Sequence, residues 1–393
     1  MSAEITALVR RSGAALATPR RLTALRRAAP ALGLFAAARL SGMLFLAGWA
    51  WHLGRSPRAL LATTWDADWY IKIAANGYGR TLYWPGGVVQ SDLAFFPLYP
   101  SLLRAVTTAL PVAGGTAGLL VSWTAAAAAA WGIYAVGDRL AGRRTATALV
   151  LLWGLLPHSI VLSMAYTEPV MTALAAWALW AVLERRWLWA GALAALAGLS
   201  RPNAVAVAAA VTAAAAVALW RGGRAVRGDW RVWAAGLVAP LGWCGYVLSV
   251  GARKGDPLRG YFAVQAAWTS RFDFGHGSLR FVRKLAMRPY DLGYTMAFLI
   301  TAAALLLFAL FLLERPPLPV LVYTAVLVLI TVGGSGFFES KPRFLLPAFP
   351  LLLPLAAALT KARPRAAVLV TAALAGLSFA YGAYLLTLAP MAL

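Results

Sequence analysis

Apolar segments of about 20 residues recur along most of this chain, and they restrict its fold more than any other feature. A helix of that length crosses a hydrocarbon core roughly 30 Å thick. Composition agrees, because 61% of the 393 residues are hydrophobic and only 12% are charged, about half the charged share of a soluble protein. The apolar content excludes a disordered chain, and the single cysteine, Cys244, excludes a disulfide scaffold. We therefore predict an all-α, polytopic membrane protein.

The net charge of +23 could indicate a nucleic-acid partner, but the distribution of Lys and Arg argues against one. The basic residues occur in short clusters between apolar segments, which is the pattern that the positive-inside rule describes. We expect the clusters to lie on the cytoplasmic side together with the N-terminus: 139–144, 185–186, 221–231, Arg315 and 361–365. The membrane surface, not nucleic acid, is the expected partner of this charge.

Counting apolar segments under this rule predicts about eleven membrane-spanning helices in one domain over 31–393, preceded by a basic cytoplasmic segment at 1–30. The first span is too long for a cleaved signal peptide. We place the spans at 31–53, 116–137, 145–163, 168–183, 187–200, 203–220, 231–250, 291–313, 317–333, 345–360 and 366–389. The stretch 95–110 is not counted, because Pro97, Pro100 and Arg104 suit an interfacial helix.

This order of spans collects the irregular segments on the outer face, and any chemistry with them. The long segments are a candidate catalytic loop at 54–115 and a second outer loop at 251–290, with shorter segments at 158–168 and 334–344. The cytoplasmic connections are short and basic, and they contain no catalytic-looking residues.

The strongest group of functional candidates lies in the first outer loop and reads Trp65-Asp66-Ala67-Asp68-Trp69-Tyr70, continuing to Gly77 and Tyr78. The pattern predicts a short amphipathic helix that ends at Gly77, with both aspartates near its start, where negative charge is favoured. Two carboxylates among aromatic rings suit acid–base chemistry on a sugar held against the rings. An interfacial aromatic belt, with Asp66 only capping the helix, is the alternative.

Three further segments carry residues that are unusual in or beside apolar helices. They are 91–100 with Phe96 and Tyr99, Tyr166-Thr167-Glu168-Pro169, and Ser200-Arg201-Pro202-Asn203. The first is a site wall or a structural re-entrant element. Glu168 beside a span is costly unless it is paired or hydrated, although helix capping would also explain it. Arg201 is expected near the outer headgroups, as a snorkelling side chain or as a clamp for a phosphate or carboxylate.

Cations on the outer face complete the set of candidates. Lys341 and Arg343 lie in one outer segment, and the loop 251–290 contains further Lys and Arg residues. Arginines near an outer membrane surface suit the phosphate of a lipid-linked substrate. Arg39 falls within the first span, where it would snorkel inward or pair with an acid.

Together these segments resemble the PIG-V family, the GPI mannosyltransferase 2-like proteins and their bacterial relatives. The resemblance rests on Trp65-Asp66-Ala67-Asp68-Trp69-Tyr70 followed by Ala94-Phe95-Phe96-Pro97-Leu98-Tyr99-Pro100. Tyr166-Thr167-Glu168 and Arg201-Pro202-Asn203 follow in the order of that family's Tyr-Ser/Thr-Glu and Arg-x-Asn stretches, with a fainter echo at Pro342-Arg343-Phe344. Trp69 stands where the eukaryotic members have another side chain.

The resemblance implies a GT-C glycosyltransferase that transfers a sugar, mannose by default, from a polyprenyl-phosphate donor with inversion. Asp66 would be the base, with Asp68 and Glu168 as supporting or orienting catalytic residues. Arg201, Arg343 or Lys341 would neutralise the leaving phosphate, and Tyr166 would bind the sugar. The full set of expected substrate-binding residues is Trp65, Trp69, Tyr70, Lys72, Phe96, Tyr99, Tyr166, Arg201, Asn203, Lys341 and Arg343.

The composition, rich in Ala, Arg and Trp, suggests a high-GC bacterium, so we expect a plasma-membrane enzyme whose acceptor is a glycan, glycolipid or protein other than a GPI anchor. No His or Cys cluster indicates a metal, although the Asp66-x-Asp68 pair leaves a divalent cation as an alternative. A polytopic transporter or lipid flippase is the competing function, and an inactive protein of glycosyltransferase shape is a third.

Overall fold

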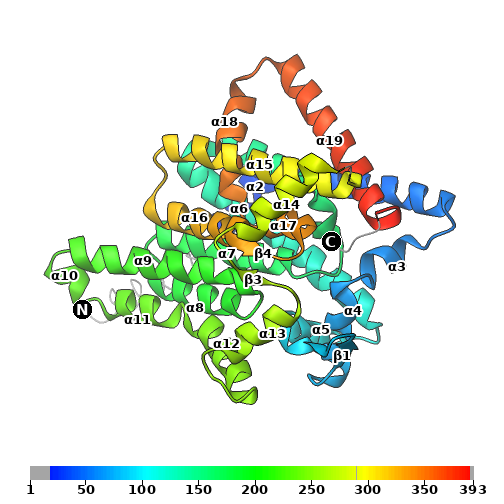
Figure 1. The fold of residues 1–393 in the computed structure, drawn as a ribbon. Helices are drawn as coiled ribbons and strands as arrows, with labels where there is room; N and C mark the ends of the chain where they lie inside the picture. Colours follow the sequence, from blue (N-terminus) through cyan, green and yellow to red (C-terminus); the bar gives the residue numbers. More distant parts are fainter. Residues whose placement is uncertain (1–17, 289, 390–393) are drawn as a thin grey trace, which may run out of the picture.

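The computed structural model describes residues 18–288 and 290–389 as a bundle of helices with two short β-ribbons (Figure 1). In the first half the elements are α2 (Thr18–His52), α3 (Pro57–Ala62), α4 (Asp66–Asn76), β1 (Thr81–Trp84), β2 (Val88–Ser91), η1 (Asp92–Ala94), α5 (Leu98–Ala109), α6 (Gly114–Gly154), η2 (Ser159–Ser163), α7 (Glu168–Leu183) and α8 (Trp187–Gly198). Then follow η3 (Pro202–Ala204), α9 (Val205–Arg221), α10 (Arg224–Arg227), α11 (Trp230–Val238), α12 (Leu241–Arg253), α13 (Gly260–Ala267), β3 (Arg271–Phe272), α14 (His276–Met287), α15 (Leu292–Leu313), α16 (Leu318–Gly333), β4 (Gly334–Ser335), η4 (Phe338–Ser340), α17 (Lys341–Leu345), η5 (Phe349–Leu352), α18 (Leu353–Lys361) and α19 (Pro364–Thr387).

Six helices within the described residues are long and apolar enough to cross a membrane, and a bent pair over 338–361 would be a seventh. Three further apolar helices, α7, α8 and α16, are shorter. The structure thus supports a multi-pass protein, whereas the count of eleven spans stays a prediction. The expected span 345–360 is broken between α17 and α18 by a bend of 78°. Prolines at 347, 350 and 354 suit that break, because each removes a backbone donor.

The element α6 contains most of two expected spans, 116–137 and 145–163, joined by a reversal at Gly142. Gly142 has φ +80°, a conformation that glycine adopts without steric cost. The two arms lie close together at the reversal, since a Cβ on Gly137 would lie 3.0 Å from the Ala146 Cα. The second arm ends at Gly154, earlier than expected, and the chain continues into the 3₁₀ turn η2.

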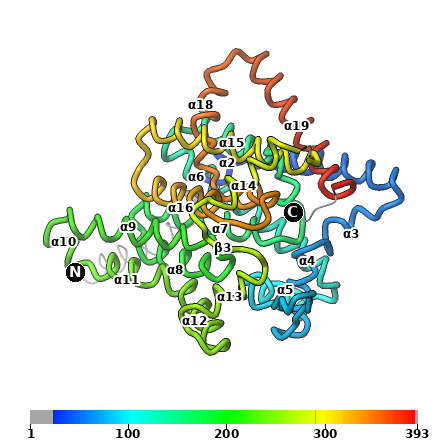
Figure 2. Tube along the Cα trace, in the orientation of Figure 1, coloured from blue at the N-terminus to red at the C-terminus, as the bar shows by residue number. Residues whose placement is uncertain are grey.

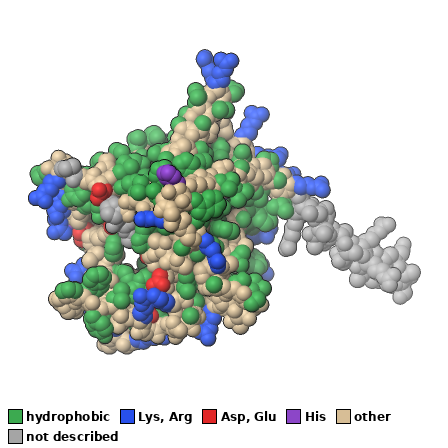
Figure 3. Space-filling model, turned by 90° about the vertical axis from the view of Figure 1, so that its right-hand side faces the viewer, with side chains coloured by type: hydrophobic (Ala, Val, Ile, Leu, Met, Phe, Trp, Pro, Cys, Tyr) green, Lys and Arg blue, Asp and Glu red, His purple; other side chains and the backbone are tan. Residues whose placement is uncertain are grey.

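Three of the basic segments, from α2, the α6 reversal and α18, lie together in the structure, whereas their side of the membrane stays a prediction. Arg139 near the α6 reversal pairs with Glu184 after α7, with Nε and Oε1 3.2 Å apart. Arg27 of α2 and Thr360 of α18 share a hollow with this reversal. The α9–α11 connection lies at the left of Figure 1, whereas α4, α5 and β1 lie at the lower right. In the space-filling view, Lys and Arg gather in separate patches, one of them at the tip that α18 and α19 form (Figure 3).

The first helix packs against the last one. Residues 1–17, including Arg10 and Arg11 of the expected cytoplasmic segment, lie outside the described residues, and α2 is already helical from Thr18. Figure 2 shows the early blue and the late red part of the trace side by side. The Trp49 indole donates a hydrogen bond of 3.1 Å to the Thr387 hydroxyl at this contact. Arg39 lies midway along α2 and is buried.

Arg39 neither snorkels nor pairs with an acid, so both expectations for it are wrong. Its guanidinium donates to the hydroxyls of Ser159 and Ser163 and to the carbonyl of Gly154. These neutral acceptors satisfy most of its donors inside the bundle. No carboxylate among the described side chains forms an ion pair with Arg39.

The secondary structure of the two loops expected on the outer face, 54–115 and 251–290, was predicted with different success. The amphipathic helix over 95–110 is α5, which buries Tyr99 and Leu103 and exposes Arg104. The first loop also contains an antiparallel ribbon, β1–β2, in which Thr81 pairs with Ser91. The second loop, 251–290, is largely ordered as α13, β3 and α14, so its description as irregular is wrong. Its amphipathic helices were missed because they are short and interrupted by Gly and Asp.

Glycines set the close approach of α8 and α12. A Cβ on Gly242 would lie 1.8 Å from the carbonyl oxygen of Ala195, whereas a Cβ on Gly245 of the same helix would meet nothing within 4 Å. We therefore expect Gly242→Ala to lower the free energy of unfolding by about 1–3 kcal/mol or more. Gly245→Ala is expected to change it by less than about 0.5 kcal/mol. Thermal unfolding of the purified protein in detergent measures both, and equal behaviour of the two variants would contradict the packing.

Candidate active site

Four charged side chains from distant parts of the chain meet where α4, α7, η3 and α17 converge. Arg343 Nη1 lies 2.7 Å from Asp66 Oδ2, and Arg343 Nε lies 3.3 Å from Glu168 Oε1. Arg201 Nη1 contacts the same Glu168 oxygen and donates to the Thr167 hydroxyl at 3.1 Å. We call Asp66, Glu168, Arg201 and Arg343 the charged cluster. It unites three of the predicted segments with the 341–344 segment.

Burial separates Asp66 from the other members of the charged cluster. Glu168 is fully buried, and Arg201 and Arg343 are 7% and 6% exposed. The Asp66 side chain is 25% exposed. Buried charges are tolerated only when they are paired, and here two guanidiniums balance two carboxylates. Asp66 Oδ2 is bound by Arg343, whereas Oδ1 forms no hydrogen bond with any side chain or backbone group in the described part of the chain. Asp66 is thus the partly exposed carboxylate of an otherwise buried and neutral cluster.

The backbone before Asp66 is strained. Trp65 has φ +53°, which is rare for a residue other than glycine, and it directly precedes the first residue of α4. The Asp66 amide approaches the hydroxyl of Tyr166 at 3.4 Å. Tyr166 is itself held by Ser122, whose hydroxyl donates to the Tyr166 carbonyl at 2.8 Å. Such strain persists only where the surroundings enforce it, and it occurs often at functional sites.

Helix capping does not explain Glu168. It is the first residue of α7, where the helix dipole favours a carboxylate, but its side chain is ion-paired with two arginines. Snorkelling does not explain Arg201 either, because its side chain is buried against Glu168. The ring of Phe344 lies beside both guanidiniums, 5.6 Å from that of Arg201 and 5.3 Å from that of Arg343. Phe344 belongs to the Pro342-Arg343-Phe344 echo in the sequence, but no role of its own was predicted for it.

Two tyrosines, Tyr70 and Tyr166, border the charged cluster. Burial, together with the negative charge of Asp66, raises the pKa of Tyr70 and of Tyr166 well above the usual value. Both phenols therefore stay protonated. The Arg343 guanidinium lies 5.3 Å from the Tyr166 ring. Asn203, two residues after Arg201, is also buried. Its side-chain amide has no hydrogen-bond partner among the residues described.

Asp68 is not part of the charged cluster. Its carboxylate binds Lys72 Nζ at 2.7 Å and Arg80 Nη1 at 3.0 Å, and its side chain is 40% exposed. Burial alone would raise the pKa of Asp68, but the hydrogen bonds from Lys72 and Arg80 outweigh it and lower the pKa. The structure thus gives Asp68 and Lys72 a role in holding the first outer loop. Arg80 was missed, because no pattern in the sequence links it to Asp68.

Four other expected substrate-binding residues make their contacts with residues outside the charged cluster. Lys341 donates to the carbonyl oxygens of Thr331 and Gly334 at the end of α16, so it does not face outward as expected. Phe96 is 1% exposed and packs on Tyr246, with ring centroids 4.5 Å apart. The Tyr99 hydroxyl bonds Ser122 and the carbonyl of Gly118 inside the bundle. Trp65 packs partly buried against the main core.

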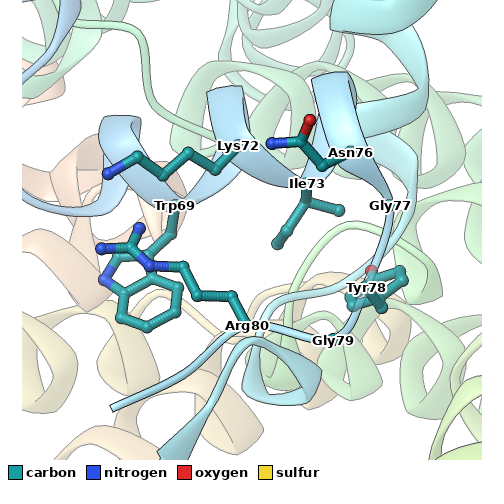
Figure 4. A pocket seen from close by; sticks show the side chains of 8 residues that line it. All are labelled: Trp69, Lys72, Ile73, Asn76, Gly77, Tyr78, Gly79 and Arg80. Atoms are coloured by element: carbon teal, nitrogen blue, oxygen red, sulfur yellow. The ribbon is translucent and has the colours of Figure 1, made fainter.

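A hollow of about 230 Å³ lies along α4, beginning at Trp69 (Figure 4). It is lined by Trp69, Lys72, Ile73, Asn76 and residues 77–80. Asp66, Trp69 and Ile73 share one face of α4, since residues three and four apart are neighbours on a helix. Figure 4 shows Lys72 and Asn76 on α4 and Arg80 on the segment that follows it. The Arg80 guanidinium lies 4.2 Å from the centre of the Trp69 ring.

The wall of this hollow is aromatic. The Trp69 ring stacks on Phe95 with a centroid distance of 5.5 Å, and Trp268 of the second outer loop meets its edge at 5.2 Å. Buried Asp92 accepts hydrogen bonds of 2.8 Å from the amides of Gly79 and Arg80 and thereby fixes the loop. Within residues 18–288 and 290–389, no three His, Cys, Asp or Glu side chains are grouped so that they could hold a metal ion.

Comparison with known proteins places this arrangement in a fold family. No protein-family model and no curated protein matches the chain. The crystal structure of the Archaeoglobus fulgidus oligosaccharyltransferase in the apo form superposes over 89% of this chain with a TM-score of 0.53 and 13% sequence identity. The likeness is one of fold, and it extends over most of this chain. Archaeoglobus AglB with an inhibitory peptide and a dolichol-phosphate covers 90% of the chain at 15% identity and a TM-score of 0.45.

The expected all-α membrane fold is thus confirmed, and it resembles the fold of the archaeal oligosaccharyltransferase. The chain spans 56% of the length of the archaeal enzyme in the apo form. At 13% sequence identity the likeness shows the fold alone. The resemblance to the PIG-V family stays a prediction. In this bundle Asp66 and Glu168 each begin a helix.

Proposed function

We propose that this protein is an inverting membrane glycosyltransferase that moves a sugar, mannose by default, from a polyprenyl-phosphate donor to an acceptor hydroxyl, with Asp66 as the base. The observation that carries the proposal is the partly exposed Asp66 carboxylate, bound to Arg343 through one oxygen, in an otherwise buried and neutral cluster. The GT-C fold supports the same reaction class. Mannose and the PIG-V relationship rest on the sequence resemblance.

The reaction assigns the two Asp66 oxygens different roles. Oδ1 takes the proton from the acceptor hydroxyl while the acceptor oxygen attacks the anomeric carbon. The bond between that carbon and the phosphate oxygen breaks, and the lipid phosphate leaves with the electron pair. Oδ2 stays bound to Arg343, which keeps the carboxylate oriented. A positioned general base of this kind contributes about 10²–10⁴-fold to the rate.

Proton transfer to Asp66 also changes the net charge of the charged cluster in the same step in which the lipid phosphate leaves. With two guanidiniums and two carboxylates the resting cluster is neutral. When Asp66 becomes protonated, the cluster carries one net positive charge, and Arg343 loses its ionised partner. The leaving phosphate gains one negative charge in the same step. Arg343 and, through Glu168, Arg201 are therefore placed to stabilise the leaving group electrostatically. Lys341 is not needed for this, because its ammonium group is bound to backbone oxygens.

We assign the acceptor to the hollow beside Trp69. It offers an aromatic wall, the ammonium of Lys72, the amide of Asn76 and the guanidinium of Arg80, which together suit a hydroxyl-rich glycan or glycolipid. It begins within one or two helical turns of Asp66 on the same face of α4. A protein acceptor would need an extended segment to enter the same hollow.

The reaction is tested with protein reconstituted in liposomes. Polyprenyl-phosphate-mannose and soluble or lipid-linked acceptors are supplied, and released polyprenyl phosphate and glycosylated product are measured. We expect a product of inverted anomeric configuration. Parallel donors that carry glucose or N-acetylglucosamine decide the sugar. Movement of intact donor across the bilayer without cleavage would favour the transporter alternative, and cleavage of no donor would refute the proposal.

We also propose that the charged cluster faces the outside of a bacterial plasma membrane. The test replaces Cys244 with Ser and places one cysteine at Val88 in the β1–β2 ribbon or at Ala141 in the α6 reversal, both exposed. A membrane-impermeant maleimide is expected to label position 88 in intact cells and position 141 only after permeabilisation. The reverse pattern would invert the orientation.

A further inference from the structure

The end of the bundle opposite the charged cluster contains a second hollow, of about 580 Å³. Its walls come from α2, α6 and α18 and include Arg27, Tyr134, Arg143, Arg144, Thr147 and Thr360. The first arm of α6 runs from Gly114, beside Ile71 of α4, to the reversal at Gly142. At about 1.5 Å per residue this arm is roughly 40 Å long. The hollow is therefore separate from the candidate active site.

The described residues that line this hollow carry positive charge. Arg27, Arg143 and Arg144 are exposed at its rim, and none of the described lining residues is a carboxylate. None of these three guanidiniums forms an ion pair or a side-chain hydrogen bond with the described part of the chain. Asp138 of the same arm forms no ion pair with them either. By contrast, neighbouring Arg139 pairs with Glu184.

A buried hydroxyl lies at the same place. Tyr134 is 4% exposed and lines the hollow, and its hydroxyl has no hydrogen-bond partner among residues 18–288 and 290–389. Buried polar atoms are almost always hydrogen-bonded in folded proteins. The Tyr134 hydroxyl is therefore available as a donor in the same hollow as the three guanidiniums. Tyr134 precedes the Gly142 reversal by about two helical turns, roughly 12 Å along the arm.

We propose that this hollow binds the phosphate headgroup of an anionic phospholipid. Arginine guanidiniums recognise phosphate oxygens through paired hydrogen bonds, and a neutral phenol adds a further donor. Basic pockets between spanning helices at the cytoplasmic side are suited to anionic lipid headgroups. Because the hollow opens beside helices of the bundle, a lipid can place its phosphate there while its acyl chains stay in the bilayer.

The test measures lipid retention by native mass spectrometry of protein released from vesicles of phosphatidylglycerol and phosphatidylcholine. We expect preferential retention of phosphatidylglycerol, and a loss of about tenfold or more in the R143Q/R144Q double variant. Tyr134→Phe removes only the hydroxyl and is expected to lower retention several-fold. The matched control is R363Q/R365Q at the α18–α19 tip, which removes the same charge at the same end outside the hollow.

Each outcome decides the proposal. Selective loss in R143Q/R144Q or Tyr134→Phe, with the control unchanged, supports the site. Equal loss in the control would show a diffuse effect of surface charge and overturn it, as would equal retention of the two lipids by the parent protein. Displacement of the lipid by millimolar inorganic phosphate would assign the hollow to free phosphate and overturn the lipid assignment. The single-atom change at Tyr134 keeps the test decisive if the double variant does not fold.

Discussion

Asp66→Asn is expected to reduce sugar transfer at least about 100-fold while leaving the protein folded. The amide cannot accept the acceptor proton, yet it has the same shape, and its oxygen still accepts a hydrogen bond from Arg343. Arg343 also keeps its contact with Glu168 at 3.3 Å, so no buried cation is left unpaired. Initial rates of product formation at saturating donor measure the effect, and unchanged thermal unfolding confirms the fold.

The matched control for this prediction is Asp68→Asn, two residues further along the same helix. Its carboxylate is 40% exposed and pairs with Lys72 and Arg80, not with the charged cluster. We expect a rate within a few-fold of the parent protein, because exposed ion pairs contribute about 0–1 kcal/mol. Retained activity in Asp66→Asn would remove Asp66 as the base. An equal loss in both variants would mean that the whole helix, and not one carboxylate, is required.

Glu168→Gln is expected to destabilise the protein by about 3–5 kcal/mol. Glu168 is fully buried and is the ion-pair partner of Arg201, so the substitution leaves the Arg201 guanidinium buried without a counter-charge. Arg343 retains Asp66 and is affected less. The measurement is thermal unfolding in detergent, followed by tryptophan fluorescence. Activity is expected to fall as well, since the charge balance beside Asp66 is altered.

Two comparisons make the stability prediction specific. Glu184→Gln also removes one arginine partner, but Glu184 and Arg139 are exposed, with 37% and 59% of their side chains accessible, so a change below about 1 kcal/mol is expected. The double variant E168Q/R201Q removes both buried charges and is expected to recover part of the stability lost in Glu168→Gln. A double variant as unstable as the sum of the single variants would show that the two residues do not act as a pair.

The class of the protein and its helix order could be predicted because they depend on local properties of the chain. Apolar segment length and the need to satisfy backbone groups in lipid leave few alternatives to a helical bundle. The basic connections near Arg139 and Thr360 meet at one end as their clusters indicate. The helix from Asp66 to Gly77 is also local, since its charges and its glycine lie where a helix begins and ends.

Which charges pair with which was decided by the tertiary structure alone. Arg343 binds Asp66 across 277 positions of sequence, and no local pattern contains that contact. Asp66 and Asp68 are two residues apart on one helix, as are Lys341 and Arg343 on another, and in each case only one member reaches the charged cluster. Successive residues of an α-helix are turned by about 100°, so side chains two positions apart point to nearly opposite sides. Composition and motif therefore make both residues of each pair candidates for the site. The packing of α4, α7 and α17 decides which residue of each pair joins the charged cluster.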